Sequence, residues 1–144
     1  MSIFEPAPPP WPGRALSIVR IVLGGVFITF GTMKLFGVPP LPPEVAIPVF
    51  SQAWIGGVLE VVGGILIVLG FLTRPTAFIL SGEMAVAYWQ EHAPQSPWPP
   101  INGGTPAIAY CFFFLYLVFA GAGPWSLDAL IARRRGAATE ATTS

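Results

Sequence analysis

Four long apolar stretches dominate the pattern of hydrophobic and polar positions along the chain. They cover residues 15–36, 52–72, 75–91 and 105–122. An apolar helix needs about 20 residues to cross the hydrocarbon core of a bilayer. The pattern therefore predicts four transmembrane helices, of which the third is the shortest.

The segments outside these stretches are polar, proline-rich or charged. Residues 126–135 (SLDALIARRR) predict a short amphipathic helix lying on the membrane surface. The proline-rich residues 1–13 and the residues 136–144 predict flexible tails. We therefore expect one membrane domain, residues 14–135.

Composition supports a membrane protein. The chain is 53% hydrophobic and only 10% charged, and its formal net charge is zero. A water-soluble domain of this size carries far more charge, and a nucleic-acid-binding surface needs an excess of basic residues. The expected class is an all-α, integral membrane four-helix bundle whose main partner is the lipid bilayer, with no role in nucleic-acid binding.

Basic residues predict the orientation of these helices. Arg14, Arg74 and the run 133–135 fall on one side of a four-span topology, whereas residues 37–51 and 92–104 contain no lysine or arginine. Basic residues near span ends favour the cytoplasmic side, so both termini are predicted to be cytoplasmic. The two proline-rich loops on the opposite side are either rigid connectors or lids over the outer face.

The sequence contains little redox or metal-binding chemistry of its own. Cys111 is the single cysteine and His92 the single histidine. A CxxC pair or a bis-histidine haem site is thereby excluded, and we expect no metal and no intrinsic cofactor. Electrons in any redox role would have to come from a diffusible cofactor or from a partner protein.

Acidic and basic residues inside the apolar stretches are the main candidates for function. Glu60 is flanked by glycines three and four positions away on each side, and small residues mark the face on which membrane helices pack. Arg20 and Lys34 lie on a similar glycine-containing face of the first span. The glycines that we expect to mediate helix packing are Gly24, Gly31, Gly56, Gly57, Gly63 and Gly64.

Glu60 and Glu83 are predicted to lie in one layer. Each is roughly 12 Å from the outer boundary at 1.5 Å rise per residue, and Lys34 leans inward toward either acid. Arg20 leans toward the cytoplasm, where Asp128 is its expected ion-pair partner. Because one lysine cannot neutralise two separated acids, we expect one acid to be protonated at neutral pH.

Two interpretations of the polar layer formed by Lys34, Glu60 and Glu83 stay open. A buried ion pair can fix the register of two helices without taking part in any chemistry. Alternatively, the layer forms a pocket for a small ligand or a proton, since a charge at mid-bilayer costs about 2.5–3.5 kcal/mol.

Three segments give the chain a resemblance to a known family. They are RIVLGGVFITFGTMKLFG, GGVLEVVGGILIVLGFLTRP, and NGG followed by a helix and FAGAGPWSLD. In this order they resemble the DoxX family of small four-helix membrane proteins, although Thr105 stands where the family often has an acid. The family is named after a subunit associated with thiosulfate:quinone oxidoreductase.

The resemblance implies a bacterial-type inner-membrane protein. It would be a subunit or anchor of an oxidoreductase system that contacts a quinone and a redox partner protein, either as a non-catalytic subunit or as a catalytic one. The alternative is a membrane protein that binds or transports a lipid or small molecule without a redox role. A homo-oligomer is allowed but not required, because one bundle can satisfy both glycine faces.

Overall fold

The computed structural model describes residues 9–143, and within them the side chains of residues 9–138. All regular elements of the described part are helices, and it contains no strand, as the sequence predicts. In chain order the elements are α1 (Trp11–Phe36), α2 (Gln52–Leu69), α3 (Thr73–Ala87), the π-helical turn η1 (Tyr88–His92), α4 (Pro99–Asn102), α5 (Thr105–Ala120) and α6 (Leu127–Thr143).

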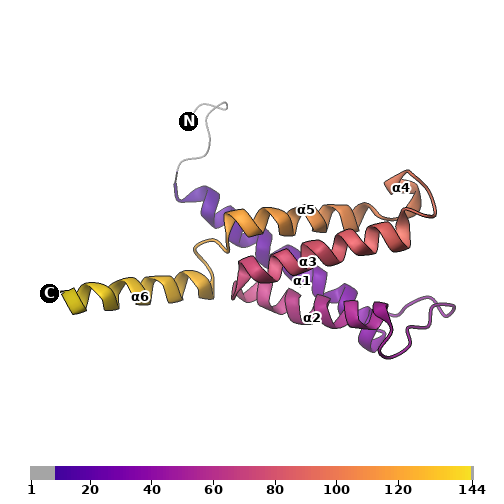
Figure 1. Ribbon diagram of the computed structural model, residues 1–144, viewed down its shortest axis with the longest axis horizontal. Helices are drawn as coiled ribbons and strands as arrows, with labels where there is room; N and C mark the ends of the chain where they lie inside the picture. The colour runs from indigo at the N-terminus through magenta and orange to yellow at the C-terminus, as the bar shows by residue number, and fades with distance from the viewer. Residues whose placement is uncertain (1–8, 144) are drawn as a thin grey trace.

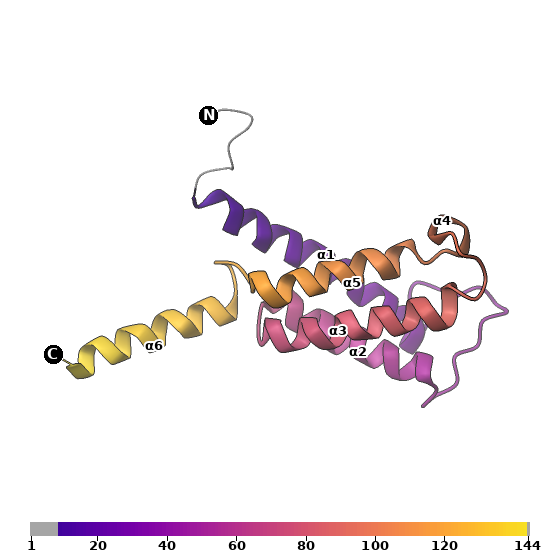
Figure 2. The same ribbon diagram turned by 45° about the horizontal axis from the view of Figure 1, so that its top comes forward.

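Four of these helices pack together. α1 lies against α2, α3 lies against α5, and α2 contacts α3 between these two pairs. Figures 1 and 2 show the loop 37–51 and α4 at one end of this assembly. The start of α1, the turn between α2 and α3, and α6 are at the other end, so α1 starts and α6 leaves at the same end of the molecule.

Within residues 9–143, two helices are long and apolar enough to cross a membrane. They are α1, with 26 residues, and α2, with 18; α5 is apolar but has 16 residues. α2 ends three residues earlier than predicted, because Gly70 adopts a left-handed conformation (φ +64°) that terminates the helix. Its amide donates to the carbonyl of Ile67.

The chain ends are more helical than the sequence predicts. α6 continues to Thr143, through residues 136–143 that were expected to form a flexible tail. The Ser126 hydroxyl accepts a hydrogen bond from the amide of Ala129, which caps the helix. α1 likewise begins at Trp11, inside the predicted N-terminal tail, whereas residues 1–8 of that tail lie outside the described residues.

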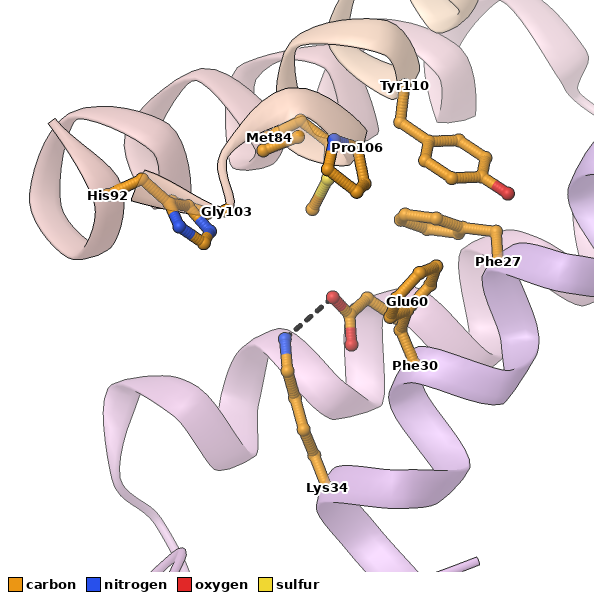
Figure 3. Close-up of a pocket in the computed structure, with 11 residues that line it drawn as sticks. Phe27, Phe30, Lys34, Glu60, Met84, His92, Gly103, Pro106 and Tyr110 are labelled. Atoms are coloured by element: carbon orange, nitrogen blue, oxygen red, sulfur yellow. Dashed lines mark hydrogen bonds and ion pairs between the residues drawn. The ribbon is translucent and has the colours of Figure 1, made fainter. Parts of the chain in front are cut away.

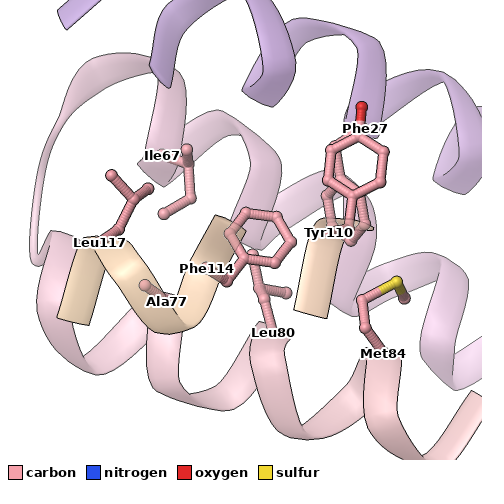
Figure 4. Close-up of a cluster of buried hydrophobic side chains, with 8 residues drawn as sticks. All are labelled: Phe27, Ile67, Ala77, Leu80, Met84, Tyr110, Phe114 and Leu117. Carbon is pink, nitrogen blue, oxygen red and sulfur yellow. The ribbon is translucent and has the colours of Figure 1, made fainter. Parts of the chain in front are cut away.

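The buried core is small and lies between the four packed helices (Figure 4). Its members are Phe27, Ile67, Ala77, Leu80, Met84, Tyr110, Phe114 and Leu117. The rings of Phe27 and Phe114 meet edge to face with centroids 4.8 Å apart, which joins α1 to α5. Much apolar surface remains outside this core, since Ile18, Val22 and Val26 on α1 are about half exposed. An apolar surface of this kind suits contact with lipid.

The glycines of α2 divide their contacts between two neighbouring helices. A Cβ at Gly57 would come within 2.9 Å of Lys34 Cβ, and one at Gly64 within 2.6 Å of an Ile28 side-chain atom, both on α1. A Cβ at Gly63 would instead meet Leu80 of α3 at 2.7 Å. Gly57 and Gly64 therefore let α1 approach α2, and Gly56 and Gly63 let α3 approach it, on either side of Glu60.

The glycines of α1 complete this contact. A Cβ at Gly31 would lie 2.7 Å from the Gly57 carbonyl oxygen, and one at Gly24 would lie 3.1 Å from an Ile67 side-chain atom. At Gly31 the obstacle is backbone, which cannot rotate away. Helices α1 and α2 are thus close enough for the charged side chains of both to meet.

Candidate functional site

Lys34 and Glu60 form an ion pair between α1 and α2 (Figure 3). Lys34 Nζ donates to Glu60 Oε1 at 2.7 Å. The Glu60 side chain is only 3% exposed, whereas that of Lys34 is 29% exposed. Because charge-assisted hydrogen bonds are strong in surroundings with little water, this pair fixes both side chains in position.

The Lys34–Glu60 pair faces a cavity of about 240 Å³, which we call the aromatic cavity. Its other lining residues come from α1, α3, η1, α5 and the connection before α5, namely Phe27, Phe30, Met84, Ala87, His92, Gly103, Pro106, Ala107 and Tyr110. Figure 3 shows His92, Met84, Pro106 and Tyr110 across the cavity from the pair, with Phe30 beside Glu60. The cavity combines one charged end with apolar, largely ring-shaped walls.

The His92–Gly104 connection forms the rim of the aromatic cavity. His92 Nδ1 lies 2.9 Å from the Asn102 carbonyl oxygen, which can only accept, so Nδ1 is the donor. The buried Asn102 side chain donates to the Ser96 carbonyl oxygen and accepts from the Gly104 amide. These bonds hold the NGG turn in place, and in the neutral ring they leave the lone pair on His92 Nε2.

Only one of the two proline-rich loops contributes to this site. His92 and Gly103 of the second loop line the aromatic cavity, whereas no residue between 37 and 51 does so. Of the two loops that could have served as lids, the structure places the second at the cavity.

Glu83 of α3 lies in the same layer but faces a different space. A Cβ at Gly56 would lie 3.1 Å from Glu83 Oε1 and 4.0 Å from Lys34 Nζ, so both groups approach α2 at this glycine. Glu83, Lys34 and Gly56 line a second cavity of about 480 Å³, which we call the lateral cavity. Lys34 lines both cavities, whereas Glu60 lines only the aromatic cavity and Glu83 only the lateral one.

The polar layer is incompletely paired. Among the described residues, Glu60 Oε2 and Glu83 Oε2 are buried and have no hydrogen-bond partner. Buried polar atoms are normally satisfied, and each exception calls for an explanation. The Lys34 ammonium is hydrogen-bonded to Glu60 Oε1 and not to Glu83. Each cavity is therefore lined by an acid with one buried oxygen that can still accept a hydrogen bond.

Arg20 is completely buried at the opposite end of the helical assembly. Its guanidinium donates to the carbonyl oxygens of Ala122 (2.7 Å), Val68 (2.6 Å), Trp125 (2.5 Å) and Ile67. Two of these carbonyls, of Ile67 and Val68, belong to the last turn of α2, where no further helical turn follows to bond them. The Ile67 oxygen also accepts from the Gly70 amide. Arg20 therefore ties the end of α2 to the segment that follows α5.

Asp128 has a separate structural role. Its carboxylate accepts from the amides of Leu72 and Thr73 at 2.9 Å each, and its own amide donates to the Gly70 carbonyl oxygen. Asp128 thereby caps the start of α3 from a distant part of the chain. The expected Arg20–Asp128 ion pair is not among the contacts of the described residues, because both side chains bind backbone groups instead.

Sequence reasoning missed the lining residues that come from the loop and from α5. His92 was considered only as a metal ligand, and Tyr110 was not singled out. Tyr110 donates its hydroxyl to the Leu23 carbonyl oxygen at 3.2 Å and stacks its ring near Phe27. The signal for Tyr110 was weak because α5 is aromatic on most sides, which hides the inward position.

An apolar exterior and two candidate membrane-spanning helices among the described residues suit a membrane protein, and the Lys34–Glu60 pair gives it an internal polar site. The chain belongs to the DoxX family, whose profile matches residues 15–93. That match includes both partners of the ion pair and Glu83.

Two curated relatives support the same class. An uncharacterized protein of Haemophilus influenzae is 42% identical over 120 residues, covering 78% of this chain and 87% of that protein. An uncharacterized membrane protein of Mycobacterium tuberculosis is 28% identical over 156 residues, covering 93% of this chain and 96% of that protein. No solved structure matches the chain significantly.

Proposed function

We propose that the chain is a four-span inner-membrane protein whose aromatic cavity binds the head group of a quinone and presents it to an oxidoreductase partner. The observation that carries this proposal is the Lys34–Glu60 pair, which is the charged end of an otherwise apolar, ring-walled cavity. A quinone head group has the same division, with a flat apolar ring and carbonyl oxygens at its edge.

The topology we propose places both termini in the cytoplasm. In support, α1 begins and α6 leaves at the same end of the assembly, and Arg74 lies at that end. Basic residues concentrate on the cytoplasmic side of membrane proteins. Tryptophans with more than half of their surface exposed occur at both ends of the assembly, as expected of membrane interfaces.

Single-cysteine labelling tests this topology. Starting from a Cys111→Ser chain, cysteines at Ser2 and Thr142 should react with an impermeant maleimide only after the cytoplasmic side is opened. A cysteine at Glu44 should react in intact cells. Labelling of residues 2 and 44 from the same side would refute an odd number of spans between them and with it the proposed arrangement.

The aromatic cavity has the chemistry to hold a quinone. The Lys34 ammonium has three N–H groups, of which Glu60 uses one, so it can also donate to a quinone carbonyl. Glu60 Oε2, which is buried and unpaired, can accept a hydrogen bond from a quinol hydroxyl. The Phe27 and Tyr110 rings offer apolar faces for stacking. At about 240 Å³ the cavity accommodates a head group, and the tail of the quinone would lie outside it.

Titration of the purified full chain with ubiquinone-1 in dodecylmaltoside tests this function. We expect saturable binding that weakens about tenfold or more in Lys34→Met, because a charge-assisted hydrogen bond contributes about 1.5–3 kcal/mol. Glu44→Gln, a change at an exposed loop acid, is the control and should bind normally. Unchanged binding in Lys34→Met, or no binding by the unaltered chain, would refute the proposal.

Native mass spectrometry of the chain released directly from its membranes tests the redox assignment. We expect a bound quinone together with a stoichiometric oxidoreductase partner. Retention of a non-redox lipid in the aromatic cavity, without such a partner, would instead support a lipid-binding role. The same spectra report whether the chain is a monomer or a homo-oligomer.

A further inference from the structure

The lateral cavity lies between α2 and α3, next to the aromatic cavity but with different chemistry. Its polar lining residues are Lys34, Gln52, Glu83, Gln90, Glu91 and His92. Its apolar lining includes Ile55, Leu59, Ile79 and Val86, which are between 37% and 55% exposed. A volume of about 480 Å³ lies within the usual range of small-ligand sites.

The charges of this cavity favour a cation. Lys34 gives its hydrogen bond to Glu60, which faces the other cavity. Among the described residues, Glu83 and Glu91 are two acids of the lateral cavity without a hydrogen-bonded basic partner, and Glu83 Oε2 is buried with no donor. Lys34 also lines this cavity, so the two acids outnumber the one cation. A ligand that brings N–H donors satisfies this oxygen, and a positive charge on the ligand also offsets the charge of an ionised Glu83. A neutral donor supplies the hydrogen bond but not the opposite charge.

The access route points to the membrane as the source of the ligand. Gln52 at the start of α2 donates a side-chain hydrogen bond to Gln90 of η1, which ties the two helices together at the loop end. The four apolar lining side chains are exposed on the sides of α2 and α3, which would face lipid. A molecule entering between them needs an apolar portion that remains in contact with these side chains.

We propose that the lateral cavity binds the primary ammonium group of a membrane amphiphile, with Glu83 as its carboxylate partner. Three N–H donors can serve Glu83 Oε2, Glu91 and a glutamine carbonyl, while the hydrocarbon chain lies against Ile55, Leu59, Ile79 and Val86. The ammonium group comes either from a free alkylamine or from an ethanolamine lipid head group. This proposal does not rest on quinone binding, because Glu83 lines only the lateral cavity, whereas Glu60, Phe27 and Tyr110 line only the aromatic one. The two cavities share Lys34, Ala87 and His92.

Equilibrium binding of dodecylammonium to the full chain in dodecylmaltoside tests the proposal. Dodecanol, which lacks the charge, and dodecyltrimethylammonium, which lacks N–H donors, should each bind about tenfold more weakly or worse. Lysophosphatidylethanolamine compared with lysophosphatidylcholine distinguishes the two sources. Preference for the ethanolamine lipid identifies a lipid head group, and binding of dodecylammonium alone identifies a free amine.

Variants locate the site. Glu83→Gln should weaken dodecylammonium binding about tenfold or more and leave ubiquinone-1 binding unchanged, whereas Glu44→Gln should change neither. If Glu83→Gln fails to fold, Leu59→Trp fills the cavity from its lipid side without altering charge and should give the same loss. Equal binding of dodecanol and dodecylammonium, or full ammonium binding by Glu83→Gln or by a folded Leu59→Trp chain, would overturn the proposal.

Discussion

Replacement of Arg20 by leucine is expected to lower the stability of the chain by about 3–5 kcal/mol, the largest single-residue effect we predict. The guanidinium is fully buried and donates to four backbone carbonyl oxygens. Leucine removes this donor from all four, although the Ile67 oxygen keeps the hydrogen bond from the Gly70 amide. Because total stabilities of 5–15 kcal/mol are typical, such a change threatens the folded state itself.

The thermal midpoint in detergent, followed by size-exclusion chromatography after heating, measures this effect. We expect the Arg20→Leu midpoint to fall by about 10 °C or more. The thermal midpoint of Arg20→Lys should fall between those of the unaltered chain and Arg20→Leu. A single ammonium group cannot bond at once to the carbonyl oxygens of α2 and to those beyond α5, as the planar guanidinium does.

Arg14→Leu is the matched control for the Arg20 change. Arg14 lies on the same helix but is exposed, and its recorded contact is with the Trp11 ring. Its replacement should shift the midpoint little, since single surface changes are usually within about 0.5 kcal/mol. Equal midpoints for Arg20→Leu and Arg14→Leu would show that the carbonyl contacts of Arg20 do not hold the bundle together.

Lys34→Met is expected to destabilise the chain by about 3 kcal/mol, because it leaves Glu60 buried without its counter-charge. Glu60→Gln should lower the stability of the chain by less than Lys34→Met does, since the Lys34 side chain is partly exposed and its ammonium can reach polar surroundings. The double variant Lys34→Met/Glu60→Gln should recover much of the loss, because neither charge is then left unpaired.

The double variant also separates the two interpretations of the ion pair. If the pair only fixes helix register, a double variant of near-normal stability should bind ubiquinone-1 as the unaltered chain does. If the pair is part of a ligand site, the double variant should regain near-normal stability but should still bind ubiquinone-1 weakly or not at all. A coupling free energy near zero between the two substitutions would contradict the ion pair itself, because charges in contact do not act independently.

The sequence was most informative where a property depends on position along one helix. The apolar stretches predicted the helices of the membrane domain, and the glycine spacing around Glu60 predicted that this acid turns away from lipid. Glu60 is buried with α1 on one side and α3 on the other, and its partner is Lys34, which was predicted to reach either Glu60 or Glu83. Helical periodicity alone determines which side chains share a face.

Partners supplied by the backbone could not be predicted in this way. Arg20 and Asp128 are both charged and lie toward the same end of the chain's fold, so an ion pair was the natural expectation. In the structure, Arg20 binds a carbonyl group at the end of α2 and Asp128 binds an amide at the start of α3. Both are main-chain groups at helix ends, where the helix itself supplies no partner. Every residue carries such groups, so the sequence gives no signal for which of them a folded chain leaves unpaired.

The sequence by itself determined a helical membrane protein and predicted Lys34, Glu60 and Glu83 in one polar layer, because hydropathy and helical period are local properties. Only the tertiary structure decided that Lys34 bonds to Glu60, that Glu83 lines a separate cavity, and that His92 and Tyr110 complete the first one. Cavities form between elements that are distant in sequence, so their shape depends on how helices pack rather than on any one helix.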